Sequence, residues 1–103
     1  MSQERLNRLR DKIEALDAEL VRLMEERRAL VIEVGGIKEK LGLPVMDPTR
    51  EAAVVRRAAT LAREQGGNEE LVRDVIWRII ASARDDQKGR GRWGPAANPE
   101  SSE

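Results

Sequence analysis

The 103-residue sequence contains no cysteine and no histidine, and it also lacks phenylalanine and tyrosine. Without cysteine there are no disulfides, no thiolate nucleophile and no thiolate metal site. Without histidine, the commonest general base and the commonest imidazole ligand are missing. Any enzyme chemistry must therefore use carboxylates, cations, amides and hydroxyls. The core must be built from Leu, Ile, Val, Ala and Met, with Trp77 as the one plausible aromatic member.

Long apolar runs and an excess of one charge are also missing. No apolar run approaches the roughly 20 residues that a membrane span needs, and the opening segment MSQERLNRLR lacks the apolar core of a signal peptide. The 19 Lys and Arg residues are balanced by 19 Asp and Glu residues, so the basic field expected of a nucleic-acid-binding domain is absent. We therefore expect a cytoplasmic protein with no membrane or nucleic-acid partner.

Apolar residues recur every three or four positions through the first part of the chain. The stripe consists of Leu6, Leu9, Ile13, Leu16, Leu20, Leu23, Leu30, Val34, Ile37 and Leu41. Its period, close to 3.5, predicts one helix from about Arg5 to Leu41 with coiled-coil-like packing. Such a helix is about 55 Å long, whereas a compact domain of this size has a radius of gyration of about 13 Å. The stripe of so long a helix needs a second chain, which predicts a dimer.

Two shorter helices are predicted after the long one. The second spans about 48–65, with Asp47 as its cap and small apolar residues at Ala52, Val55, Ala59 and Ala62. Its end is marked by the segment QGGN, in which Asn68 caps a third helix that continues to about Gln87. Proline residues in LGLPVMDP break the first helix. We therefore predict an all-α fold with three helices per chain, in an intertwined helical homodimer.

The predicted domain covers residues 1–87. Residues 88–103 are rich in Gly, Pro and Ser without periodicity, and we predict that they form a disordered C-terminal tail. Inside the long helix, Gly35 and Gly36 each cost about 1 kcal/mol relative to alanine. Two interpretations of this pair are open: a tolerated weak spot, or the close approach of another backbone or a ligand.

Cations interrupt the apolar stripe of the long helix. Arg27 takes a stripe position, and Lys38 lies eleven residues further on, within about 20° of the same direction around the helix. Arg10 directly follows the stripe position Leu9. A lone polar residue can simply fix the register of a helix pair, but in an antiparallel dimer Arg10 would approach the partner's Arg27 and Lys38. Cations on an interior face need an anion, supplied by a protein carboxylate or by a small dianionic ligand.

Further polar residues lie at the start of the second helix and the end of the third. Arg50 and Glu51 occupy the first turn after the Asp47 cap, where the helix dipole favours Glu. Gln87 continues the apolar stripe of the third helix, seven residues after Ile80. Taken alone, these residues indicate only a helix start and an exposed helix end.

Taken together, these segments resemble the all-helical chorismate mutases, in particular their small homodimeric bacterial type. The resemblance covers residues 6–87 and rests on LRDKIEALDAELVRLMEERRALVIEVGGIK, on PVMDPTRE, on the II pair of the third helix and on the final Gln. It implies a dianionic substrate, chorismate, and a unimolecular Claisen rearrangement to prephenate on the way to phenylalanine and tyrosine. That reaction needs no nucleophile, metal or cofactor.

The resemblance also implies roles for the cations and the amide. By position, Arg27 and Arg10 of the partner subunit would clamp the two substrate carboxylates. Lys38 and Gln87 would donate to the ether oxygen, where negative charge grows as the C–O bond breaks. Orientation of the substrate and fixed positive charge would then lower the barrier.

The ring hydroxyl of the substrate would lie near Asp47 and Glu51, with Arg50 supporting the same pocket. One position departs from the family pattern. Ala83 stands where the family commonly has a serine that binds a substrate carboxylate. Either the site lacks this contact, or the third helix is locally shifted so that the adjacent Ser82 replaces it.

Two other functions remain open at this stage. An isochorismate-pyruvate lyase on the same scaffold would use the same cations on an isomeric substrate and release pyruvate. A non-catalytic helical dimerisation module would use Arg27 only to set register. The match across PVMDPTRE and Gln87 favours the mutase.

Overall fold

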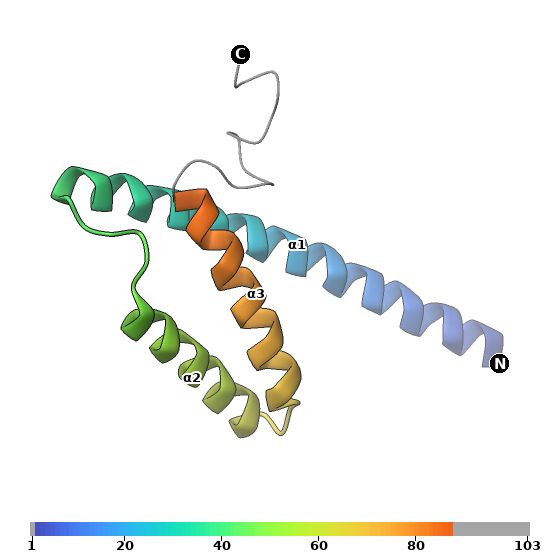
Figure 1. Ribbon diagram of the computed structural model, residues 1–103. Coiled ribbons are helices and arrows are strands. Elements are labelled where there is room, and N and C mark those ends of the chain that lie inside the picture. The colour runs from blue at the N-terminus through green and yellow to red at the C-terminus, as the bar shows by residue number, and fades with distance from the viewer. Residues whose placement is uncertain (1, 88–103) are drawn as a thin grey trace, which may run out of the picture. The chain divides into compact units, whose positions relative to one another are not determined.

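The computed structural model describes residues 2–87, which form three α-helices joined by short connections (Figure 1). The helices are α1 (Ser2–Leu41), α2 (Pro48–Glu64) and α3 (Glu69–Gln87). The described range contains no β-strand. The predicted all-α fold with one long N-terminal helix is therefore confirmed. The predicted tail of residues 88–103 lies outside the described residues.

The chain divides into two compact units, Met1–Leu30 and Val31–Glu103. The described part of the first unit consists of α1 up to Leu30. The second unit contains the last turns of α1 together with α2 and α3. Each unit is described separately below.

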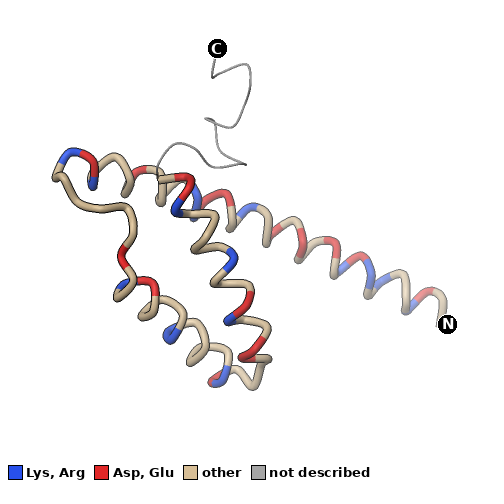
Figure 2. Tube along the Cα trace, viewed as in Figure 1, with Lys and Arg blue, Asp and Glu red and all other residues tan. Residues whose placement is uncertain are grey.

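The first unit carries an apolar stripe that a single chain leaves open to solvent. The exposed fractions of its residues run from 40% at Leu6 to 64% at Leu16. Charged residues of both signs are interspersed along the helix (Figure 2), and Arg22 forms ion pairs with Glu19 and Glu26 on neighbouring turns. Pairs at this spacing favour the helix, while the apolar stripe itself stays exposed.

The N-terminal caps of α2 and α3 are the residues that the sequence predicts. Asp47 Oδ1 accepts a hydrogen bond from the backbone N–H of Arg50 at 3.1 Å, and Pro48 takes the first helical position. Asn68 Oδ1 accepts one from the backbone N–H of Leu71 at 3.0 Å. Each cap satisfies a backbone donor that the first turn of a helix leaves without a partner.

Glycine ends both α1 and α2. Gly42 and Gly66 have φ angles of 70° and 68°, in the left-handed region that glycine enters without strain. Beyond Gly42 the backbone N–H of Leu43 bonds to the carbonyl of Lys38 at 2.8 Å. The turn out of α1 is thus made at Gly42, before the prolines to which the sequence interpretation assigned it.

Within the second unit, α2 and α3 pack against each other (Figure 1). Their buried apolar residues are Val55, Ala59, Ala62 and Ile80. Three of the four small residues predicted to form the apolar face of α2 belong to this set, and Ala52 is half-buried. Trp77 is 45% exposed in the single chain, so the prediction that it joins the core is not met within one chain. Many large apolar side chains between residues 2 and 87 are exposed in a single chain.

No helix between residues 2 and 87 is both long enough and apolar enough to cross a membrane.

Candidate active site

The last turns of α1 and the C-terminal end of α3 are joined by Lys38 and Gln87, both of which are half-buried. Lys38 Nζ donates a hydrogen bond to Gln87 Oε1 at 3.3 Å and another to the carbonyl oxygen of Val45 at 2.9 Å. An ammonium group has three N–H donors, so one remains for a ligand. Because the Gln87 oxygen accepts from Lys38, the amide NH₂ group is left as the donating end of that side chain.

Gly35 makes this approach of α3 to α1 possible. A Cβ atom at position 35 would lie only 2.9 Å from the Cα and carbonyl oxygen of Gln87. A Cβ atom at Gly36 would meet nothing within 4 Å. Of the two interpretations open for this glycine pair, close approach of another backbone therefore holds for Gly35, and Gly36 shows no such contact.

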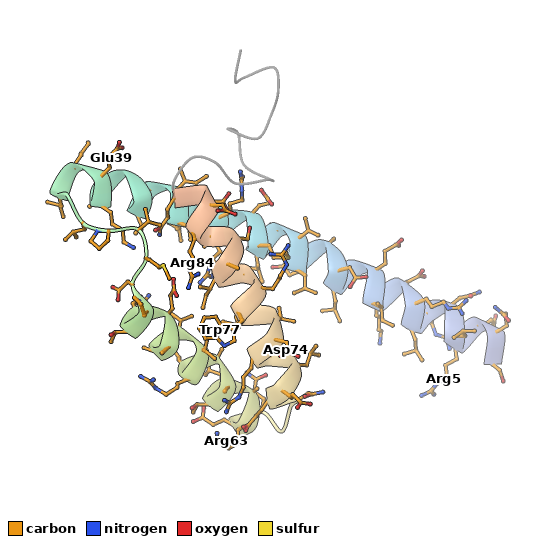
Figure 3. All side chains as sticks on the ribbon, viewed as in Figure 1. Arg5, Glu39, Arg63, Asp74, Trp77 and Arg84 are labelled. Atoms are coloured by element: carbon orange, nitrogen blue, oxygen red, sulfur yellow. The ribbon has the colours of Figure 1, made fainter. Side chains whose placement is uncertain are left out.

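A second polar contact links α2 to α3 through Glu51 and Arg84, the latter labelled in Figure 3. Arg84 Nε donates to Glu51 Oε2 at 2.9 Å, and Arg84 Nη2 donates to Oε1 of the same carboxylate. The exposed fraction is 11% for the Glu51 side chain and 34% for the Arg84 side chain. The guanidinium thus holds both oxygens of a carboxylate that is largely withdrawn from water.

These hydrogen bonds set the ionisation of Glu51. They hold the pKa of the Glu51 carboxyl below its usual value near 4.5, against the effect of burial, which raises it. The charge of Asp47 also raises this pKa and the charge of Lys38 lowers it. In return, the Glu51 carboxylate raises the pKa of the Arg84 guanidinium. Both partners are therefore charged at neutral pH.

These contacts bring polar groups from the end of α1, the start of α2 and the end of α3 into one region. We call this set the polar cluster; it consists of Lys38, Asp47, Glu51, Arg84 and Gln87. Four of its members were predicted as site residues from the sequence. Asp47 both caps α2 and acts electrostatically on Glu51.

The remaining four predicted site residues are not members of the polar cluster as it is defined above. Arg10 and Arg27 belong to the Met1–Leu30 unit, and their roles stay predictions. Arg50 is exposed in the first turn of α2. Ala83 and Ser82 are both half-buried in α3, and which of them faces a substrate carboxylate stays a prediction.

Arg84 is the polar-cluster residue that the sequence interpretation missed. It lies four residues after the buried Ile80 and three before Gln87, which is the spacing of one helix face. The same reasoning that singled out Arg27, a cation on an apolar stripe, would have found it. Its partner Glu51 could not be identified in that way, because the pairing depends on how α2 and α3 pack.

The fold and the polar cluster define a helical protein that brings ammonium, guanidinium, carboxylate and amide groups together. Among residues 2–87, no group of three or more Asp or Glu side chains is arranged to hold a metal ion. A sequence profile of the family described as chorismate mutase type II matches residues 9–88. The chain belongs to the chorismate mutase type II family.

Curated relatives agree with this assignment. A chorismate mutase of Methanocaldococcus jannaschii is 35% identical over 85 residues, which are 82% of this chain and 86% of the relative. A T-protein of Haemophilus influenzae is 36% identical over 88 residues, or 84% of this chain and 23% of the relative. A 4-amino-4-deoxychorismate mutase of Streptomyces venezuelae is 34% identical over 78 residues, or 76% of each chain.

The chain spans about a quarter of the length of the T-proteins that it matches, 23% in each case. No solved structure gives a significant match to the chain.

Proposed function

We propose that this chain catalyses the rearrangement of chorismate to prephenate. The observation that carries the proposal is the Lys38–Gln87 hydrogen bond, which joins two side-chain donors at one edge of the polar cluster in a member of this family. The reaction is unimolecular, so orientation of the substrate and fixed charge are enough to accelerate it. We further propose that it serves phenylalanine and tyrosine biosynthesis in the cytoplasm.

In this mechanism Lys38 and Gln87 act on the ether oxygen of the substrate. Negative charge accumulates on that oxygen while the C–O bond breaks, so donors already in place stabilise the transition state more than the ground state. The Lys38 ammonium keeps one N–H donor beyond the two it gives to Gln87 and Val45. The Gln87 amide supplies the second donor without any change of charge.

The two substrate carboxylates are assigned to Arg27 and to Arg10 of the partner subunit. A guanidinium fork can bind both oxygens of a carboxylate, which fixes orientation as well as charge. The ring hydroxyl is assigned to the Asp47 and Glu51 side of the polar cluster, with Arg50 as a supporting cation. Ala83 offers no hydroxyl to a carboxylate, and a hydrogen bond to a charged group contributes about 1.5–3 kcal/mol, so we expect weaker substrate affinity than in relatives with serine there.

We propose a homodimer with active sites shared between the chains. The support is the exposed apolar stripe of the Met1–Leu30 unit, where Leu16 is 64% and Leu30 is 60% exposed in a single chain. An apolar stripe of this length at a helical period is stable in water when a second helix covers it. The shared site follows from the position of Arg10, which needs a partner to reach Arg27.

The test is an assay of the purified full-length chain with chorismate and, separately, with isochorismate. We expect prephenate from chorismate. Pyruvate from isochorismate without prephenate from chorismate would instead identify an isochorismate-pyruvate lyase. Failure to convert either substrate would leave a non-catalytic helical dimerisation module.

A further inference from the structure

The Glu51–Arg84 pair differs in kind from a second ion pair between α2 and α3, formed by Arg63 and Glu69. In that second pair only Arg63 Nε takes part, and the side chains of Arg63 and Glu69 are 63% and 28% exposed. Glu51 is 11% exposed and is held through both of its oxygens by two different nitrogens of Arg84. The carboxylate of Glu51 is therefore fixed in direction and its charge is offset at close range.

Because Arg84 offsets the charge of Glu51, it decides which ligand group the Glu51 carboxylate can bind. An ionised carboxylate has about four lone-pair sites, of which Arg84 occupies two, so Glu51 can still accept a hydrogen bond from a neutral hydroxyl. A cationic group would gain little from a carboxylate that is already neutralised, and it would be repelled by the guanidinium of Arg84. An aliphatic amine is protonated near neutral pH. The pair therefore favours a hydroxyl over an amine.

We propose that Arg84 is a specificity-determining residue, which makes the Glu51 side of the site select a substrate with a neutral ring hydroxyl over the analogue with an amine in its place. This inference rests on the proposed function, which assigns the ring hydroxyl to Glu51. The choice between a hydroxyl and an amine is relevant to this chain, because a relative that is 34% identical is named as a 4-amino-4-deoxychorismate mutase.

Arg84 is assigned no step of the rearrangement. It acts through Glu51, by orienting the carboxylate and by cancelling its charge. Its removal would leave Glu51 as a largely buried anion without its guanidinium, and a site of that kind attracts a cation. The expected consequence is a change in preference between two substrates, which a purely structural role of Arg84 would not produce.

The experiment measures kcat/KM of the full-length chain for chorismate and for 4-amino-4-deoxychorismate. The variants are Arg84→Leu, which removes the cation, and Arg84→Lys, which keeps the charge and loses the two-point fork. Arg63→Leu is the matched control, because it breaks the exposed ion pair between the same helices. Thermal unfolding and circular dichroism of each variant report whether it is folded.

We expect the wild type to prefer chorismate and Arg84→Leu to shift the ratio of the two kcat/KM values toward the amine by about tenfold or more. The ratio for Arg84→Lys should lie between those of the wild type and Arg84→Leu, and Arg63→Leu should keep the wild-type ratio. The inference is overturned if both rates fall in parallel in Arg84→Leu, or if the ratio does not move. The inference is also overturned if the wild type converts the amine as efficiently as chorismate, and this result does not depend on whether the variants fold. Absence of chorismate conversion by the wild type would overturn the proposed function itself, a result distinct from an unchanged ratio.

Discussion

Lys38 Nζ lies 3.3 Å from Gln87 Oε1 and donates a hydrogen bond to it, which ties the last turns of α1 to the end of α3. The bond orients the Gln87 amide, because its oxygen is engaged and its NH₂ group faces elsewhere. It also fixes the Lys38 ammonium, which is held on a second side by the carbonyl of Val45. Under the proposed function, two donors that are in place before a substrate arrives need no reorganisation during the reaction.

The first prediction concerns Gln87 and pH. A glutamine amide is neutral at every working pH, and the chain has no histidine to titrate near neutrality, so kcat/KM of the wild type should be nearly flat between about pH 5 and 8. In Gln87→Glu, the ionised carboxylate would oppose the negative charge growing on the ether oxygen. Its protonated form can donate much as the amide does. The variant should therefore be poor at about pH 8 and recover as the pH falls.

The midpoint of that recovery depends on two opposing effects on the new carboxyl, since burial raises its pKa and the nearby Lys38 ammonium lowers it. The measurement is kcat/KM against pH for both proteins. Superimposable profiles would mean that Gln87 does not act on the ether oxygen.

The second prediction compares two neighbouring glycines. Alanine is favoured over glycine inside a helix by about 1 kcal/mol, so Gly36→Ala should stabilise the protein, because a Cβ atom there meets nothing within 4 Å. Gly35→Ala gains the same helix propensity but places its Cβ atom 2.9 Å from the Gln87 backbone. It should therefore be less stable than Gly36→Ala, and its kcat should fall as Gln87 is pushed away from Lys38.

Thermal unfolding and kcat, measured on both glycine variants, check this comparison. Gly36→Ala serves as the control for propensity, since it lies one residue away in the same helix. Equal Tm and equal kcat in the two variants would show that α3 does not end against Gly35 in solution.

The third prediction tests the shared site. Arg10→Ala and Arg27→Ala should each be nearly inactive alone. When the two variants are unfolded together and reassembled, half of the dimers should be mixed, and each mixed dimer has one site with both lesions and one with neither. About a quarter of wild-type activity is then expected for random assortment. No recovery, with mixed dimers shown to form, would mean that Arg10 works within its own chain or not at all.

The fourth prediction follows from the lowered pKa of Glu51. A carboxyl whose pKa is lower in the folded state stabilises the fold above its unfolded pKa, and this contribution is lost as the pH falls through the folded value. The Tm difference between wild type and Arg84→Leu should thus be present at pH 7 and shrink below pH 4.5, the usual carboxyl value. Thermal unfolding across this range measures it. A gap that stays constant with pH would show that Arg84 contributes to stability by packing alone.

The helices were predictable because their signals are local. The period of the apolar stripe identifies α1, and each cap lies within three residues of the N–H that it accepts, as Asp47 and Asn68 show. Four members of the polar cluster were likewise predicted as site residues from their helix positions and from a family resemblance, and their roles stay predictions. These features depend on neighbours along the chain.

The contacts that build the site were not predictable in the same way. Gly35 could be a tolerated weak spot of α1 or a place where another backbone approaches closely. Which of the two holds depends on where α3 ends, and no local pattern near Gly35 contains that information. Arg84 carried a usable signal as a cation on an apolar stripe. Its partner Glu51 lies on another helix, so the pairing depends on tertiary packing.

The fifth prediction, on Lys38, tests the electrostatic mechanism itself. Lys38→Met removes the ammonium while keeping a side chain of similar length, and Lys40→Met makes the same change at an exposed position of α1. With chorismate as substrate, we expect prephenate from the wild type and from Lys40→Met at similar kcat/KM. We expect a loss of about a hundredfold or more in Lys38→Met, the size typical for removal of one preorganised donor. Equal kcat/KM in the two variants, with both folded, would contradict a mechanism in which Lys38 stabilises the transition state.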